Sequence, residues 1–243
     1  MQAGEELDDF AIAVCRNLWD EAMNSALGVN SLLEDAGLHK QVANRLLEPF
    51  MWHTVVITAT EWDNFFWQRC HPDAQPEMKA VADAIQLAYY TSTPMEIPFT
   101  EWHLPYADDP QTATDALQYL SDNHPNVFRE PAEAVTERVE VIVRKLSVAR
   151  CARTSYLQQD GQRDIEKDLA LFNRLENGMH WSPFEHVATP VMFTGDGPIF
   201  KNNKFIGNFC GWKQLRKTYR KENRTKFVPN HPLLVERIKD VQP

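Results

Sequence analysis

The sequence predicts a helix-dominated α+β fold, and three features of the chain support this class. Apolar side chains recur every three or four residues in several long segments, which is the spacing of amphipathic helices. Only two short stretches, 54–58 and 187–193, have the composition of strands. Hydrophobic residues make up 43% and charged residues 24% of the 243, so the chain has the usual composition of a protein with a buried core.

In the N-terminal part the pattern is helical over 5–50, with a break expected near Gly28 and Gly37. The stretch 54–58 follows as a strand or as an apolar turn between helices, because tertiary context often overrides β-propensity. A further helix is entered through Pro76, since proline is favoured in the first helical turn.

The C-terminal part begins after a segment, 91–130, that is rich in Pro, Asp and Thr and is predicted to be irregular. One helix is expected to start at Pro131, and another to start near Asp164 and stop at Gly178. Residues 187–193 are then expected to form a strand.

The chain has no internal repeat and no low-complexity linker, so we predict a single domain over 1–243. Its parts are a helical region 1–90, an irregular connector 91–130 and a region 131–243 that ends in a basic tail. The net charge of −9 excludes a general binder of polyanions, although nine Lys or Arg and a single acid lie between Lys201 and Lys226.

Four cysteines lie far apart and form no Cys-x-x-Cys pair, which predicts reduced thiols and neither a disulfide framework nor a metal site. No stretch approaches the roughly 20 apolar residues of a membrane span. The N-terminus lacks the basic and apolar regions of a signal peptide. We therefore expect a soluble, cytoplasmic protein without membrane partners.

Two short blocks place polar side chains among apolar and aromatic ones, where an unpaired polar group is costly. The first block runs from His180 to His186 and reads His-Trp-Ser-Pro-Phe-Glu-His. A purely structural interpretation is a loop that ends a helix, in which Ser182 caps the next turn and Glu185 pairs with a histidine.

The second block, 58–69, sets Asn64 and Arg69 around three aromatic residues. A guanidinium in such surroundings stacks on a ring or is held for an anion. The structural alternative is an ion pair of Arg69 with Glu77 or Asp73.

Together the blocks resemble the flavin-dependent thymidylate synthases. The first matches that family's His-x-Ser/Thr-Pro-Phe-Glu-His motif, and the resemblance implies that His180, Ser182 and Glu185 bind FAD. The run Ala152-Arg153-Thr154-Ser155-Tyr156 looks like the family's Ala-Arg-Val-Ser-Tyr segment, which implies that Arg153 and Ser155 lie near the flavin. A purely structural role for each of them is the alternative.

The second block resembles the family's Asn-Phe-x-x-x-Arg segment. By this resemblance Asn64 contacts the flavin, and Arg69 is the catalytic residue that contacts the uracil of dUMP and favours its ionisation. Thr58 takes a flavin-side position that is usually Asn. The segment 41–49 looks like a family helix that grips the substrate phosphate, which implies that Arg45 binds phosphate. Val42 takes the position of the family's acid, so that contact is either missing or made by Gln41.

The order of the blocks is the reverse of the usual family order, and the family's Arg-His-Arg motif is absent from the sequence. The chain therefore resembles a circularly permuted branch, in which the missing segment would precede Met1. We expect a C-terminal portion of such an enzyme or one half of a split gene, with a second polypeptide supplying the motif.

The resemblance implies methylation of dUMP to dTMP, with methylenetetrahydrofolate as carbon donor and NADPH reducing bound FAD. It also implies a homotetramer, in which 1–90 binds substrate and 131–243 binds flavin. Two alternatives remain open. One is a catalytically inactive homologue that binds flavin or nucleotide, and the other is a nucleic-acid-binding module that uses 201–226, against which the acidic remainder argues.

Overall fold

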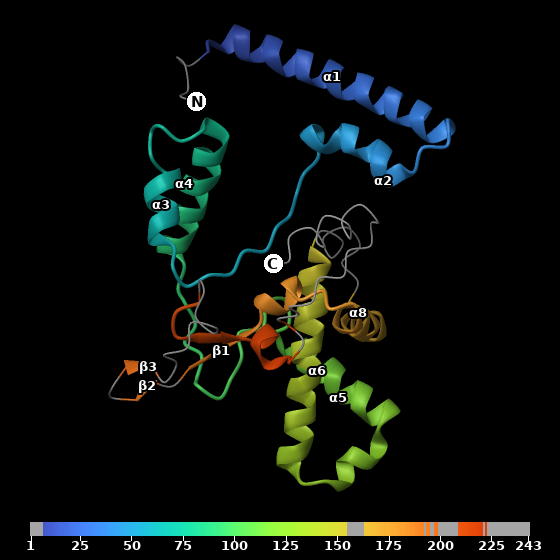
Figure 1. Cartoon of the computed structure of the whole chain (residues 1–243), viewed down its shortest axis with the longest axis vertical. Helices are drawn as coiled ribbons and strands as arrows, with labels where there is room; N and C mark the ends of the chain where they lie inside the picture. Colours follow the sequence, from blue (N-terminus) through green and yellow to red (C-terminus); the bar gives the residue numbers. More distant parts are fainter. Residues whose placement is uncertain are drawn as a thin grey trace, which may run out of the picture. The chain divides into compact units, whose positions relative to one another are not determined.

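The computed structural model describes residues 7–154, 163–191, 193–194, 197–198, 209–220 and 222 (Figure 1). Its backbone contacts divide the chain into two compact units. The first comprises Met1–Val55 and Trp62–Pro94, and the second comprises Val56–Glu61 and Met95–Pro243. The fold is dominated by helices with a little antiparallel sheet, which confirms the α+β class. The prediction of one domain over 1–243 stays a prediction.

The long helix α1 (Asp9–Asp35) begins where the carboxylate of Asp8 accepts a hydrogen bond from the amide of Ala11 at 2.7 Å. It ends at Gly37, whose φ of +90° and the bond from the Leu38 amide to the Leu33 carbonyl form a Schellman motif.

The break predicted near Gly28 is wrong, because α1 continues through that residue. One glycine in a helix interior costs only about 1 kcal/mol, which the other residues of α1 outweigh.

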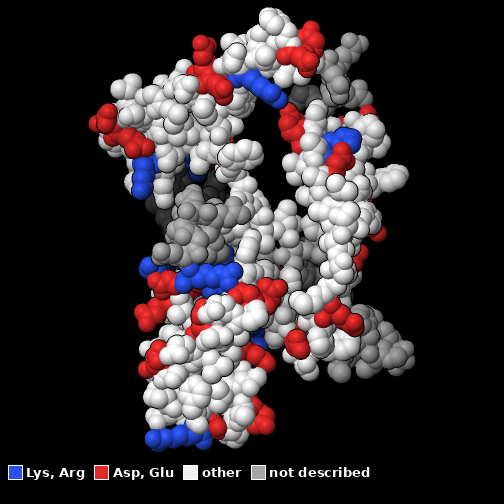
Figure 2. All heavy atoms as spheres, turned by 180° about the vertical axis from the view of Figure 1, so that it is seen from behind, with Lys and Arg blue, Asp and Glu red and all other residues white. Residues whose placement is uncertain are grey.

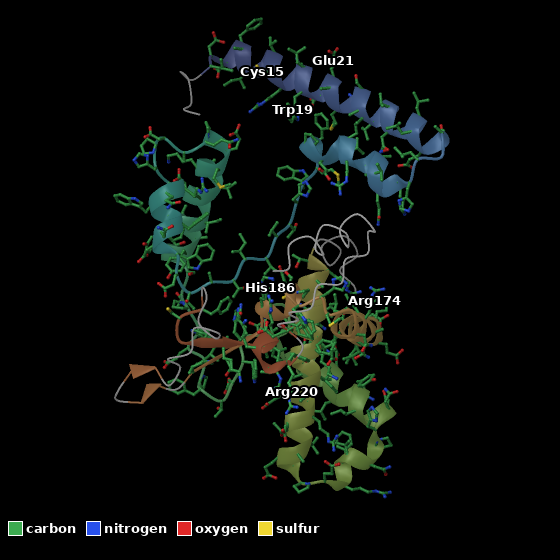
Figure 3. The ribbon with its side chains drawn as sticks, in the orientation of Figure 1. Cys15, Trp19, Glu21, Arg174, His186 and Arg220 are labelled. Carbon is green, nitrogen blue, oxygen red and sulfur yellow. The ribbon has the colours of Figure 1, made fainter. Side chains whose placement is uncertain are left out.

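A short helix α2 (Lys40–Ala43) and a 3₁₀ segment η1 (Asn44–Phe50) fold back against α1. The rings of Trp19 and Phe50 meet edge to face with centroids 5.2 Å apart, and Trp19 is labelled in Figure 3. The amide of Asn30 donates to the side-chain oxygen of Asn44 at 2.9 Å. These contacts attach the segment that carries the predicted phosphate site to a long helix.

The helices α3 (Asp63–Arg69) and α4 (Pro76–Thr91) pack together through aromatic rings. The buried ring of Phe66 lies 5.7 Å from the ring of Tyr89 and 6.1 Å from that of Tyr90, measured between centroids. Phe66 of the second block therefore holds α3 on α4, whereas Trp67 is exposed.

In the second unit, α5 (Pro110–Asn123), η2 (Pro125–Arg129), α6 (Ala132–Ala152) and α8 (Ile165–Asn177) form a helical layer. The remaining elements are η3 (Ser182–Glu185), β1 (Ala188–Pro190), β2 (Phe193–Thr194), β3 (Gly197–Pro198), β4 (Trp212–Gln214) and η5 (Leu215–Thr218). The strands β1 and β4 pair antiparallel, with Thr189 opposite Lys213, and β2 pairs antiparallel with β3.

The starts of α6 and α8 and the end of α8 lie where the sequence predicts them, at Pro131, Asp164 and Gly178. Part of the strand predicted over 187–193 is β1. The stretch 54–58 is neither strand nor helix, because its backbone pairs with no strand among the described residues.

The connector 91–130, predicted to be irregular, contains the helix α5 and the turn η2. Its Asp and Pro residues start the helix instead of breaking it: Asp109 caps the amide of Thr112 at 3.0 Å, and Pro110 is the first helical residue. Burial alone would raise the pKa of Asp109, but hydrogen bonds from Thr112 and Arg163 lower it to about 2.

A buried ion pair joins the three long helices of the second unit. Arg150 on α6 and Asp168 on α8 are 1% and 0% exposed, and the Arg150 Nε and Asp168 Oδ2 atoms lie 3.1 Å apart. The same guanidinium donates to the hydroxyl of Thr112 on α5 at 2.7 Å and to the carbonyl of Tyr106 at 2.8 Å. Arg153 also forms an ion pair with Asp168.

None of the described helices has the length and apolar composition needed to cross a membrane. Acidic side chains are spread over the face seen in Figure 2, with basic side chains between them. This distribution agrees with the net charge of −9.

We expect the substitution Asp168→Asn to lower the free energy of unfolding by about 3–5 kcal/mol, because it leaves two guanidinium groups without their shared counter-charge in the core. The matched control is Glu166→Gln, which removes an exposed acid from the same first turn of α8 and should cost at most about 1 kcal/mol. Denaturant unfolding of both variants checks this, and equal losses would contradict the role of Asp168.

Candidate functional site

The turn from His180 to His186 separates its apolar residues from its polar ones. The rings of Trp181 and Phe184 are buried in a core cluster with Phe172, and the Trp181 and Phe184 centroids lie 5.1 Å apart. The side chains of His180 and Ser182 are exposed. The apolar residues therefore anchor the turn, and polar groups beside them remain accessible.

The chain enters this turn through an unusual helix end. Met179 has a φ of +56°, a conformation that costs a residue with a side chain roughly 1–2 kcal/mol. The amide of His180 donates to the carbonyl of Leu175 at 2.9 Å, and the amide of Met179 donates to that of Glu176 at 3.1 Å, which is the Schellman pattern. The bonds and the packing of Met179 against the core hold the strained backbone.

Gly178 allows the imidazole of His180 to fold back over the helix end. A Cβ atom added at Gly178 would meet the His180 Cδ2 atom at 2.8 Å. The glycine that sequence reasoning took only as a helix stop therefore also makes room for the first histidine of the turn.

The structure differs from the purely structural interpretation of this block, in which Ser182 acts as a cap and Glu185 pairs with a histidine. The 3₁₀ turn η3 receives no side-chain cap, so Ser182 does not cap it. Glu185 forms its ion pair with Arg216 on η5 and not with a histidine. Neither the Ser182 hydroxyl nor the His180 ring hydrogen-bonds to another described residue, which leaves both free to meet a ligand.

A chain of charges extends from Glu185. Arg216 binds Glu185 on one side and Glu222 on the other, with its Nε atom 2.9 Å from Glu222 Oε2. Lys217 reaches the same Glu222 at 3.1 Å. Burial alone would lower the pKa of Arg216, but the two carboxylates outweigh it and raise that pKa above its usual value.

Thr58 lies beside the turn, although it is distant in sequence. Its hydroxyl is 3.0 Å from the Nδ1 atom of His186, and the amide of Cys210 donates to the hydroxyl of Thr60 at 2.7 Å. These bonds explain why the segment 56–61 belongs to the second unit while the residues on both sides of it belong to the first.

Two half-buried histidines lie in this region. His103 pairs through its backbone with Ala188, and its ring centroid is 6.5 Å from that of Trp212. Burial lowers the pKa of both His103 and His186, and the charges of neighbouring acids only partly counteract it. Both rings are therefore held toward the neutral form, which can accept or donate a hydrogen bond.

The other predicted site residues belong to the first unit and are all exposed: Gln41, Arg45, Asn64 and Arg69. Arg45 makes only a surface contact with Glu48 at 3.4 Å. Arg69 is the last residue of α3 and forms no ion pair within the described part of the chain, so the proposed pairing with Glu77 or Asp73 is not what the structure has.

Some residues of the resemblance have structural roles or lie beyond what is described. Arg153, expected near the flavin, is bound to Asp168. Ser155 and most of the basic segment 201–226 lie outside the described residues. No cluster of three or more His, Cys, Asp or Glu suited to a metal ion occurs among the described residues.

Sequence reasoning missed Arg216 and His103 as parts of this region. In the sequence, the basic run around Arg216 points only to the nucleic-acid-binding alternative. The single acid within that run, Glu222, was visible in the sequence and is the partner of Arg216 and Lys217.

Comparisons of the chain with family models, with curated proteins and with solved structures found no match.

We expect stability to depend on the protonation of His186. Because folding lowers its pKa, the neutral ring stabilises the fold above the ordinary pKa of about 6.5, and this contribution is lost as pH falls through the folded-state pKa. In His186→Gln the free energy of unfolding should therefore fall less between pH 7 and pH 5 than in the unaltered protein. Urea unfolding at several pH values measures this, with the exposed His124→Gln as control.

Proposed function

We propose that the chain is a flavin-dependent thymidylate synthase, or a portion of one, that methylates dUMP to dTMP. The observation that carries the proposal is the turn 180–186. Its motif residues divide into a buried apolar anchor and an accessible row of polar groups, as a cofactor-binding turn requires. The cytoplasmic location stays a prediction.

The described residues fit a flavin in part. The His180 imidazole and the Ser182 hydroxyl have hydrogen-bonding capacity that no other described residue uses. Thr58 lies at the same turn through its bond to His186. The carboxylate of Glu185 is held by Arg216, which fixes its orientation and leaves its remaining lone pairs for a ligand. FAD would supply the hydride for the reaction.

On the substrate side, the proposal assigns roles to exposed groups of the first unit. Arg69 has no internal counter-ion among the described residues, so its guanidinium is free to bind the uracil and stabilise its ionised form. Arg45 gives up little by leaving Glu48, because an exposed ion pair contributes only about 0–1 kcal/mol. It is therefore suited to a phosphate. By the resemblance, Gln41 would also bind dUMP and Asn64 would contact the flavin.

A second candidate function is supported by one specific observation. The sequence contains no Arg-His-Arg motif, so contacts that the resemblance leads us to expect have no counterpart in it. A flavin- or nucleotide-binding protein that lacks turnover, or one that needs a second polypeptide for it, would have this property.

The two candidates separate in one experiment on the purified full chain. The enzyme should bind FAD, and its reduced flavin should be oxidised in the presence of methylenetetrahydrofolate only when dUMP is added, with dTMP formed. If the chain binds flavin but forms dTMP only after a polypeptide that carries the missing motif is added, the split enzyme is selected. Bound flavin without rescue would select the inactive homologue, and no flavin binding would contradict both.

Variants of the turn test the binding residues. His180→Ala and Ser182→Ala should each weaken FAD binding by about tenfold, the loss of roughly one hydrogen bond to the cofactor. Ser121→Ala, an exposed serine of α5 in the same unit, should leave binding unchanged.

Arg69→Lys should retain the flavin and lose dUMP-dependent oxidation, while Arg16→Lys on α1 should retain both. Flavin absorbance titrations and stopped-flow spectra measure these effects.

The first unit supports the homotetramer that the resemblance implies. Among its described residues only Asn30, Ala43, Phe66 and Ala82 are buried. Large apolar side chains remain exposed on one side of α1, at Phe10, Val14 and Leu18 and again at Val29 and Leu32, with the polar Glu21 and Ser25 between these two groups. Groups of large apolar side chains in contact with water are characteristic of a surface that another chain covers.

We expect Leu18→Glu to shift the protein toward smaller species, because it places a charge within the exposed apolar group of Phe10, Val14 and Leu18. Asn24→Glu introduces the same side chain on the same helix but outside this group, and it should leave the assembly unchanged. Sedimentation velocity at micromolar concentration distinguishes the two, and an assembly that is insensitive to Leu18→Glu would argue against this interface.

A further inference from the structure

A cavity lies in the second unit, between α5, η2, α6 and α8, and none of its lining residues belongs to the candidate site. Its volume is about 630 Å³, within the range of roughly 300–1,000 Å³ typical of small-molecule sites. All of its walls belong to one compact unit, in the helical layer at the lower end of the view in Figure 1.

The walls of this cavity are mainly apolar and reach down to the core. Leu120 and Ile142 belong to the core cluster between α5 and α6, and both are buried. Val127 from η2, Val141 from α6 and Leu169 from α8 complete the apolar lining. A ligand that entered the cavity would therefore remove apolar surface from water on several sides, which favours binding by an apolar body.

Lys145 gives the cavity its specific polar group. Its side chain is half-buried, and its Nζ atom lies 5.3 Å from the centroid of the Phe172 ring. It forms no ion pair with any described residue, whereas Arg138 elsewhere on the lining is neutralised by Glu130 at 2.8 Å. The remaining acid of the lining, Glu137, is exposed and solvated.

The Lys145 ammonium forms no ion pair with an acid among the described residues, so a bound anion could form a charge-assisted hydrogen bond with it. Lys145 and Val141 lie one turn apart on the same side of α6. A ligand whose acid group binds Lys145 could therefore place its apolar part against Val141. Tyr119 adds a hydroxyl to the lining.

We propose that this cavity binds a small amphipathic anion, with its carboxylate or equivalent acid group at Lys145 and its apolar body along Val141, Leu120 and Val127. The occupant is a small molecule, since the cavity is lined on several sides by elements of a single unit. The site is separate in residues from the proposed flavin and dUMP site, so the two proposals stand or fall independently.

The test uses decanoate as the probe on the full chain, with decanol and decylamine as uncharged and oppositely charged partners of the same length. Isothermal titration should show that decanoate binds about tenfold more tightly than decanol, which corresponds to about 1.4 kcal/mol. Decylamine should bind more weakly than both. Hydrogen exchange should show decanoate-dependent protection within 117–127 and 134–146.

Two variants locate the site and its charge. Val141→Trp fills the half-buried wall and should abolish the protection, while Thr136→Trp, exposed on α6 and outside the cavity lining, should not. Lys145→Gln should reduce decanoate binding to the level of decanol and leave decanol unchanged, and Lys145→Arg should retain the preference for the acid. Equal binding of acid and alcohol, or protection unaffected by Val141→Trp, would overturn the proposal. Protection of the same segments that depends on protein concentration without a probe would also overturn it, because a second copy would then occupy the groove.

Discussion

The second unit depends on one buried ion pair, Arg150 with Asp168. A guanidinium at 1% exposure requires partners for its donors, and the structure supplies them from α8, from α5 and from the loop before α5. These partners come from segments that no local pattern relates to one another. Meeting the hydrogen-bonding needs of one side chain therefore fixes how three helices pack, and α8 in turn leads directly into the turn 180–186.

In that turn, buried apolar residues and accessible polar residues lie close together in one short segment. Trp181 and Phe184 insert into the core, and the polar residues between and beside them are left at the surface. The strained backbone of Met179 and the close approach of His180 to Gly178 both result from ending α8 at this point. Strain of this kind persists only where the surrounding packing holds it, as it does here.

The first unit presents the opposite situation. Its helices pair through a few contacts, such as Trp19 with Phe50 and Phe66 with Tyr89, and they leave much of their apolar surface exposed. A unit that buries so few of its described residues gains little from the hydrophobic effect by itself.

By itself the sequence determined the helices that have a clear apolar period and a recognisable cap, such as those that start after Pro131 and at Asp164. It also predicted a turn at 180–186, because a motif is local, while the binding roles of the residues there stay predictions. It misjudged Gly28 and the connector 91–130, since one glycine is a small penalty and Asp109-Pro110 serves equally as a loop and as a helix start. Only the tertiary structure decided the partner of Glu185, the contact of Thr58 with His186, and the burial of Arg150. Each of these joins residues far apart in the chain, and the physical reason is that a buried polar group takes its partner from whichever segment packs against it.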